Sequence, residues 1–152
     1  MPDPATSPAF RRAFLLSYGL GTVLCVIWPL ALQGLLGTLL QPGILGLSGL
    51  AEELGYTFSG LVILSALFVS WRSRKVRAEF AALDEFRRTR VMALEILLYS
   101  AIFELSALFG LIYHGLGGPQ AERYARSFIG LATVMFLVFV PRFAAWRRAS
   151  IP

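Results

Sequence analysis

Groups that usually carry out metal, redox or nucleophilic chemistry are scarce in this sequence. It holds one cysteine, Cys25, and one histidine, His114. A single cysteine excludes a disulfide within the chain and a cysteine-based metal cluster, and a single histidine excludes a haem held by two histidines of the same chain. No spacing of side chains is typical of a nucleophile–base pair, a phosphate-binding loop or a set of metal ligands. We therefore expect no catalytic residues, no metal site, no cofactor and no enzyme activity.

Charged side chains are also scarce, since they make up 15% of the residues, against about 25% in soluble domains. They gather in a few short stretches that are separated by long uncharged runs. A run of about 20 apolar residues crosses the roughly 30 Å hydrocarbon core of a bilayer as a helix. Together with 57% hydrophobic residues, this distribution predicts an integral membrane protein. The expected fold class is all-α: a single polytopic membrane domain over 1–152, built as a bundle of four transmembrane helices.

Four apolar runs are the expected spans. The first follows Arg11 and Arg12, and it is far longer than the about 7–15 apolar residues of a signal peptide, so we expect it to be retained. Trp28 and Pro29 lie inside it and predict a kink, because proline lacks a backbone N–H and clashes with the preceding turn. The expected order is a disordered tail at 1–10, spans at about 13–40, 56–71, 91–116 and 123–140, and a basic amphipathic cytoplasmic segment at 72–90.

The basic residues are distributed unevenly about these spans. Of the 14 lysines and arginines, all but Arg123 and Arg126 lie in the N-terminal tail, the 72–90 segment or the C-terminal tail. The positive-inside rule therefore places both termini in the cytoplasm, and we expect a bacterial inner membrane. Trp71 and Trp146 fit this orientation as anchors at the cytoplasmic boundary. Nucleic acid is not an expected partner, because the net charge of +5 comes from residues beside membrane spans.

The 72–90 segment has apolar residues at helical spacing between its charges. It either lies at the headgroup level or extends the second and third spans into the cytoplasm. In both cases its basic side chains are placed to bind anionic lipid headgroups. These side chains are Arg72, Arg74, Lys75, Arg77, Arg87, Arg88 and Arg90.

Glu104 lies near the middle of the third expected span, where a charged group costs about 2.5–3.5 kcal/mol. We expect its carboxyl to be protonated in this apolar setting. Two roles fit such a group: a carrier of protons or cations, or a structural hydrogen-bonding group that contacts a neighbouring helix or subunit. The polar side chains of the same span that we expect to support it are Tyr99, Ser100 and Ser106.

Glu95 is the second acidic residue of this span. It lies about half a helical circumference away from Glu104, because a helix turns by about 100° per residue, so the two carboxyls cannot face the same partner. Arg88 and Arg90 lie about one turn or two before it in the sequence. We therefore expect Glu95 to be an interfacial carboxylate that pairs with a nearby arginine.

Two pairs of small residues at a spacing of four are also present, Ser17 with Gly21 and Ser106 with Gly110. Such pairs allow membrane helices to approach closely, although they are common by chance.

The stretch from Ala101 to Ile112 reads Ala-Ile-Phe-Glu-Leu-Ser-Ala-Leu-Phe-Gly-Leu-Ile. It resembles the ion-carrying helix of rotary ATPase proteolipid subunits, in which a membrane glutamate is followed by small residues and then an aromatic-Gly-Leu run. The resemblance implies that Glu104 is the ion-binding carboxylate and that a polar segment with arginines joins two spans into a hairpin. It covers this stretch alone, and the second span holds a single glycine, Gly60, where the family has several closely spaced glycines.

Two functions follow from these observations. The first is a small non-catalytic integral membrane protein that serves as an accessory or assembly subunit, in a homo-oligomer or a larger membrane complex. The alternative is a membrane protein that handles protons or cations, with Glu104 as the carrier carboxylate. A lipid-modifying membrane enzyme comes third, for want of an acid–base or metal set.

Overall fold

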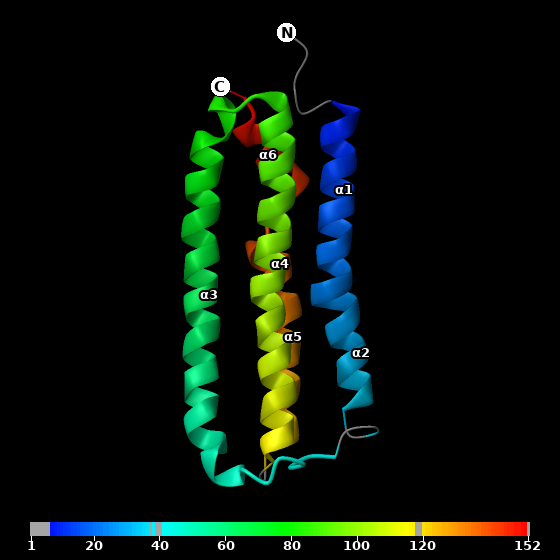
Figure 1. Cartoon of the computed structure of the whole chain (residues 1–152), viewed down its shortest axis with the longest axis vertical. Helices are drawn as coiled ribbons and strands as arrows, with labels where there is room; N and C mark the ends of the chain where they lie inside the picture. Colours follow the sequence, from blue (N-terminus) through cyan, green and yellow to red (C-terminus); the bar gives the residue numbers. More distant parts are fainter. Residues whose placement is uncertain (1–6, 37, 39–40, 118–119, 152) are drawn as a thin grey trace.

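The computed structural model describes residues 7–36, 38, 41–117 and 120–151 (Figure 1). Over these residues the chain is an all-α bundle, with four helical segments long and apolar enough to cross a membrane, which confirms the expected fold class. The helical elements are α1 (Pro8–Thr22), a π-helical turn (Val23–Ile27), α2 (Trp28–Leu35), α3 (Ala51–Glu79), α4 (Glu85–Leu116), α5 (Ala121–Phe139) and α6 (Phe143–Ala149), with 3₁₀ turns at Ser48–Leu50 and Phe80–Ala82.

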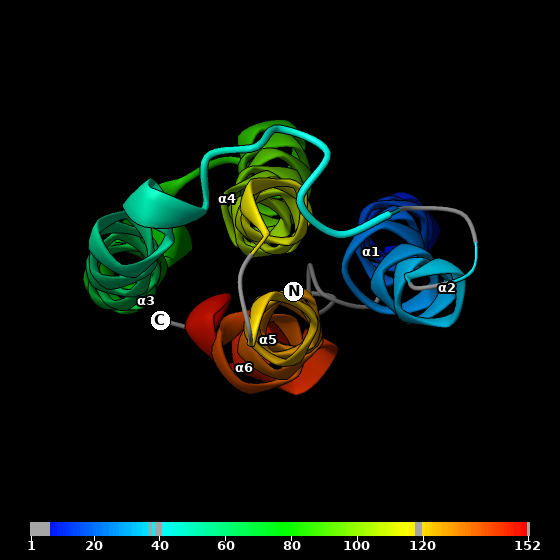
Figure 2. The same cartoon turned by 90° about the horizontal axis from the view of Figure 1, so that it is seen from below.

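Helices α4 and α5 form the centre of the bundle, as the end-on view in Figure 2 shows. They pack against each other, while the first span (α1, the π turn and α2) packs against both on one side and α3 packs against both on the other. In the most apolar 18-residue stretch of each helix, 44% of the residues are buried in α4 but 17% in α3. α3 therefore turns most of its apolar surface outward, where lipid tails or another helix cover it.

The two ends of the bundle differ in charge. The start of α1, the turn between α3 and α4, and α6 lie at one end, here called the basic end (Figure 1). The 41–50 loop, the end of α4 and the start of α5 lie at the other, here called the loop end. Every lysine and arginine except Arg123 and Arg126 lies in these basic-end segments or in the adjoining residues of α3, α4 and the α5–α6 connection. The charge asymmetry expected from the sequence is thus an asymmetry of the folded bundle.

Aromatic rings close the bundle at the basic end. Phe10 of α1 is 1% exposed, and its ring centroid lies 6.3 Å from that of Phe80 in the α3–α4 turn and 6.1 Å from that of Phe143 in α6. Trp146 of α6 is fully buried, and its ring centroid lies 5.0 Å from that of Phe80. The expectation that Trp146 anchors the chain at the lipid boundary is therefore wrong. These tilted and edge-on ring contacts join three segments that are distant in the sequence.

The disordered tail expected at 1–10 is wrong for its last residues, because α1 begins at Pro8. Residues 1–6 lie outside the described part of the chain. Ser7 is the N-cap and accepts a hydrogen bond from the backbone N–H of Phe10 at 3.3 Å. Proline is favoured at the first helical position, since its missing N–H would have no partner there. The Ser7 hydroxyl oxygen gives a partner to one of the other N–H groups that the start of a helix leaves unpaired. Burial of the Phe10 ring then adds packing that the sequence pattern does not reveal.

The 72–90 segment extends the second and third spans instead of forming a separate surface helix. α3 continues to Glu79, and α4 begins at Glu85 after a short 3₁₀ turn. Asp84 caps α4 by accepting a hydrogen bond from the backbone N–H of Arg87 at 2.9 Å. Of the two arrangements left open by the sequence, a surface helix and an extension of the two spans, the structure shows the extension of the helices.

Arg88 holds this turn in place. Its guanidinium donates hydrogen bonds to the carbonyl oxygens of Phe80, at 3.1 Å, and of Ala81. A third hydrogen bond, at 3.5 Å, reaches the carbonyl oxygen of Ser150 after α6. The side chain thus supplies donors to carbonyls that the end of a helix leaves open.

The loop that follows the first span caps α4 at the loop end. Gly43 N–H donates to the carbonyl oxygen of His114 at 3.0 Å, and Leu45 N–H donates to that of Gly115 at 2.8 Å. These carbonyls belong to the last turn of α4, where the helix itself offers no donor. Gly117 has φ +83°, and a Cβ on it would lie 2.6 Å from Gly43 Cα, so a larger residue fits neither the backbone nor the space.

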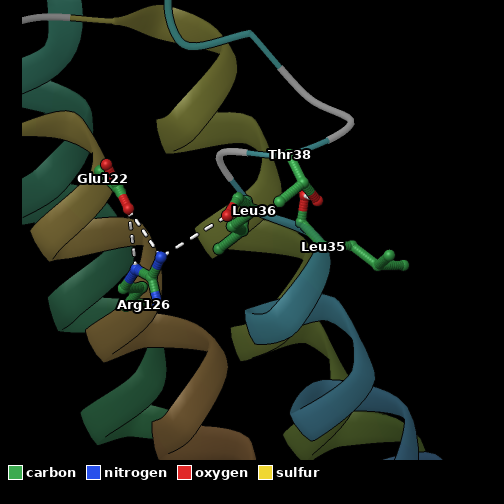
Figure 3. A network of polar contacts seen from close by, with 5 residues as sticks. All are labelled: Leu35, Leu36, Thr38, Glu122 and Arg126. Carbon is green, nitrogen blue, oxygen red and sulfur yellow. Dashed lines mark hydrogen bonds and ion pairs between the residues drawn. The ribbon is translucent and has the colours of Figure 1, made fainter.

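α2 ends at Leu35, which is earlier than the end expected for the 13–40 span. Leu36 is extended, and two glycines of low helix propensity flank this Leu-Leu pair in the sequence. The Arg126 guanidinium of α5 donates a hydrogen bond to the Leu36 carbonyl oxygen at 3.5 Å and also bonds Glu122 Oε1 at 2.7 and 3.0 Å (Figure 3). An arginine of α5 therefore joins the end of the first span to the fourth.

α4 and α5 approach each other closely at Gly110. A Cβ on this glycine would lie 2.6 Å from Ile129 Cγ1 and 2.7 Å from the carbonyl oxygen of Ala125. One turn earlier, Ser106 Oγ donates to the Phe128 carbonyl oxygen at 2.7 Å. The second of the predicted small-residue pairs thus lies where the two central helices touch.

Gly110→Ala is expected to lower the free energy of unfolding by about 1–3 kcal/mol, because the added methyl group meets the α5 backbone and forces the helices apart. Gly60→Ala on α3 is the control, since nothing lies within 4 Å of a Cβ at that position. Thermal unfolding in detergent micelles measures both changes. Equal melting temperatures for the two variants would contradict the close α4–α5 contact.

Candidate functional site

The first span carries a π-helical turn, Val23–Ile27, that ends two residues before Pro29. The Trp28 N–H donates to the carbonyl of Val23, five residues earlier instead of four. Pro29 has no N–H for the carbonyl of Cys25, four residues before it, and the hydroxyl of Thr133 on α5 donates to this oxygen at 2.7 Å. The irregularity expected at Trp28 and Pro29 is therefore present one turn earlier, and α5 supplies a donor where proline has none.

Cys25 connects the π turn to α4. It is fully buried, and its thiol donates to the Ser100 carbonyl oxygen at 3.2 Å. The Ser100 hydroxyl donates back to Ile96 O within its own helix at 2.8 Å. A Cβ on Gly21 would overlap the Ser100 hydroxyl, so the predicted pair of Ser17 with Gly21 also lies at a helix contact.

Glu104 lies on the side of α4 that faces the first span. It follows Ser100 by one turn and precedes Ala107 by one turn, and both of these residues are fully buried. It is close enough to Cys25 to act on the thiol electrostatically. Its Oε2 is buried and makes no hydrogen bond to any described residue, although the side chain as a whole is only half-buried. A carboxyl group thus stands at the edge of the π turn with an unsatisfied oxygen.

The three polar residues expected to support Glu104 do not all gather around it. Ser100 lies one turn away on the same side of α4 and contacts the same cysteine. Ser106 points toward α5, where its hydroxyl is bonded to a backbone carbonyl. Tyr99 is fully buried beside Glu95, on another side of the helix. The candidate site therefore consists of Glu104, Ser100 and Cys25, and the last of these was not predicted.

The second carboxylate of α4, Glu95, is part of an ion pair. It is 6% exposed, and the Arg72 guanidinium of α3 binds it with two hydrogen bonds, Nε to Oε2 at 2.8 Å and Nη2 to Oε1 at 2.6 Å. Two parallel bonds of this kind are among the stronger polar contacts in proteins. The expected pairing with an arginine is confirmed. The partner lies across the helix interface and is neither Arg88 nor Arg90, the basic residues nearest in the sequence.

The candidate site contains few groups that could take part in chemistry. Among the described residues no group of three or more His, Cys, Asp and Glu side chains is placed to hold a metal ion. Ion pairs in the described part of the chain join Arg72 to Glu95, Arg87 to Asp84 and Arg126 to Glu122, and none of them includes Glu104. What the arrangement offers is a carboxyl that can hold or exchange a proton, or bind a polar group that comes from outside the bundle.

Comparison with known proteins adds no relative: no protein-family model, curated protein or solved structure matches this chain. What the fold defines is a class, an integral membrane protein whose described residues form four helices able to cross a bilayer.

The Arg72–Glu95 pair is expected to couple α3 to α4 energetically. Arg72→Met is expected to destabilise the protein by about 2–3 kcal/mol, because it leaves the buried Glu95 carboxylate without its partner. Glu95→Gln is expected to cost less, because the Arg72 side chain that remains is 38% exposed. The double variant is expected to lose clearly less than the sum, as contacting residues do. Thermal unfolding of all four proteins in detergent measures this coupling.

Arg74→Met is the matched control on the same helix, since Arg74 is exposed and belongs to none of the ion pairs of the described residues. Strictly additive losses at positions 72 and 95 would show that the ion pair does not connect the helices in solution.

Proposed function

We propose that this chain is a small non-catalytic integral membrane protein that acts as an accessory or assembly subunit of a membrane complex. The observation that carries the proposal is that polar side chains inside the bundle connect one helix to another. Thr133 links α5 to the π turn, Cys25 links the π turn to α4, Ser106 links α4 to α5, and Arg72 links α3 to α4. Polar groups used in this way hold a shape, which supports a structural role.

The surface of the bundle supports a partner. On α3 the outward side chains of Ile63, Leu64, Leu67 and Trp71 are 61–62% exposed, and such a face packs equally well against lipid tails and against another membrane helix. Glu104 adds a carboxyl-bearing side chain that is only half-buried at the edge of α4, and its exposed part can meet a polar group of a neighbouring protein, which a lipid tail does not supply. The partner in this proposal is a second copy of the chain or a subunit of a larger complex.

The orientation in this proposal follows the charge of the two ends. We place the basic end, with both termini, in the cytoplasm of a bacterial cell, where positively charged segments are retained during insertion. Arginines and lysines of the 72–90 segment then lie at the inner leaflet, where anionic headgroups attract them.

The alternative function is the handling of protons or cations by Glu104. The observation that favours it is the position of the carboxyl beside a π-helical turn, since such turns occur frequently at functional sites. A carboxyl inside a membrane is also a functional candidate by default. The resemblance of the 101–112 stretch to proteolipid subunits is in keeping with this alternative.

Substitution of Glu104 distinguishes the two functions. Glu104→Gln keeps hydrogen bonding but cannot ionise, whereas Glu104→Ala loses both properties. For an assembly subunit we expect the Gln variant to form the same assembly as the wild type, seen by native electrophoresis after extraction in mild detergent. We expect the Ala variant to lose that assembly.

Proton flux into liposomes that contain the purified protein is the second measurement. Flux in the wild type that disappears in the Gln variant, with assembly intact, would overturn the assembly proposal in favour of the carrier. Wild-type behaviour of the Ala variant in both measurements would remove Glu104 from either function.

A further inference from the structure

A cavity of about 600 Å³ opens at the loop end, between the first turns of α3, the end of α4 and the first turns of α5. Clefts of about 300–1,000 Å³ are the usual size for small-molecule sites. The side chains that give this cavity its character are Glu52, Tyr56, Ser59, Tyr113, Tyr124 and Phe128. It is separate from Glu104 and plays no part in the function proposed above.

Aromatic rings form the inner wall of the cavity. Tyr113 is 8% exposed, and its ring centroid lies 5.6 Å from that of Tyr124, edge to face, and 6.0 Å from that of Phe128. On the α3 side, a Cβ on Gly55 would lie 3.0 Å from Tyr113 Cε2, so the glycine lets the tyrosine ring lie against the helix. The cavity therefore has an aromatic wall, and the exposed residues Tyr56 and Tyr124 also line it.

The cavity carries one sign of charge. Glu52 lies in the first turn of α3, is exposed, and lines the same cavity as Tyr113. It belongs to none of the ion pairs formed by the described residues. The residues that line the cavity include no lysine or arginine. A carboxylate without an ion-pair partner among the described residues thus lines the same cavity as the aromatic wall.

We propose that this cavity binds an alkylammonium group. The negative face of an aromatic ring attracts a cation within about 6 Å of its centre, and desolvated aromatic cages are well suited to ammonium groups. Glu52 supplies the opposite charge, and the hydroxyls of Tyr113 and Tyr124 accept hydrogen bonds from a primary ammonium. Two sources carry this group in or near a membrane: a free small amine, and the choline or ethanolamine headgroup of a phospholipid.

A second hollow beside the cavity allows a free amine to be distinguished from a lipid headgroup. It shares Gln120 and Ala121 with the cavity and is lined further by Arg123 and Arg126. Arg126 is already bonded to Glu122, whereas Arg123 is exposed and belongs to no ion pair of the described residues. A lipid headgroup with its ammonium in the cavity would place its phosphate on this side, where arginine binds it well. A free amine would not use Arg123.

The direct test is calorimetric titration of the full chain in a maltoside detergent with choline and with ethanolamine, at constant ionic strength. Glu52→Gln is expected to weaken binding by about tenfold or more, as loss of a charge partner does. Glu53→Gln is the matched control, because its carboxylate is adjacent in the sequence but does not line the cavity. The neutral isostere of choline, 3,3-dimethyl-1-butanol, is expected not to bind.

Three results would overturn the proposal: binding of neither amine to the wild type, equal affinity of the Glu52→Gln and wild-type proteins, or binding of the neutral isostere as tightly as choline. Ser59→Phe fills the cavity without changing its charge and is expected to abolish binding, and circular dichroism checks that the helices remain. An intact Ser59→Phe variant with unchanged affinity would place the amine elsewhere and overturn the proposal as well.

The source is then identified by native mass spectrometry of protein taken from bilayers that contain phosphatidylcholine or phosphatidylethanolamine. For a lipid occupant we expect the wild type to retain the lipid, Arg123→Gln to lose it, and choline affinity to stay unchanged in that variant. Absence of retained lipid, together with amine binding that Arg123→Gln does not affect, identifies a free amine. All of these measurements leave Glu104 untouched, so their failure is distinct from failure of the assembly proposal.

Discussion

Backbone groups inside a bilayer have no water to bind, and this constraint shapes the bundle wherever its helices are interrupted. Pro29 removes a donor in the middle of the first span, and Thr133 of α5 donates to the carbonyl of Cys25. At the loop end, Arg126 donates to the carbonyl of Leu36. At the basic end, Arg88 does the same for the α3–α4 turn. In each case the group that satisfies a local break belongs to another helix, so satisfying the backbone also joins the helices.

Helix α4 packs against α3 on one side and against the first span on the other. The carboxyl groups of Glu95 and Glu104 point in different directions, as the helical period requires. Glu95 meets an arginine of α3 and completes the contact on that side. Glu104 faces the π turn of the first span and has an oxygen without a partner among the described residues. The carboxylate on the α3 side of α4 is thus paired within the bundle. The carboxyl group on the side of the first span can contact a partner protein or carry a proton.

Much of the fold was predictable, because long apolar runs and clustered arginines follow directly from the properties of the bilayer. The sequence predicted the all-α fold of four helices long enough to cross a membrane. It also predicted the helix irregularity near Pro29 and the pairing of Glu95 with an arginine. The choice of Arg72 was not, since pairing across helices depends on how the helices dock. Phe10 and Trp146 were misplaced for the same reason: their burial depends on contacts between the chain ends and the α3–α4 turn. The need for a donor such as Thr133 could have been predicted, because a proline inside a helix leaves the carbonyl four residues earlier without its usual N–H donor.

Thr133 replaces the hydrogen bond that Pro29 cannot make. A double-mutant cycle of Thr133→Val and Pro29→Ala, followed by thermal unfolding in detergent, measures this most directly. With Pro29 present, Thr133→Val is expected to cost about 1 kcal/mol, the usual size of a hydrogen bond between membrane helices. In the Pro29→Ala background the restored N–H reaches the Cys25 carbonyl, and the same change is expected to cost close to nothing. An equal cost in both backgrounds would contradict the claim.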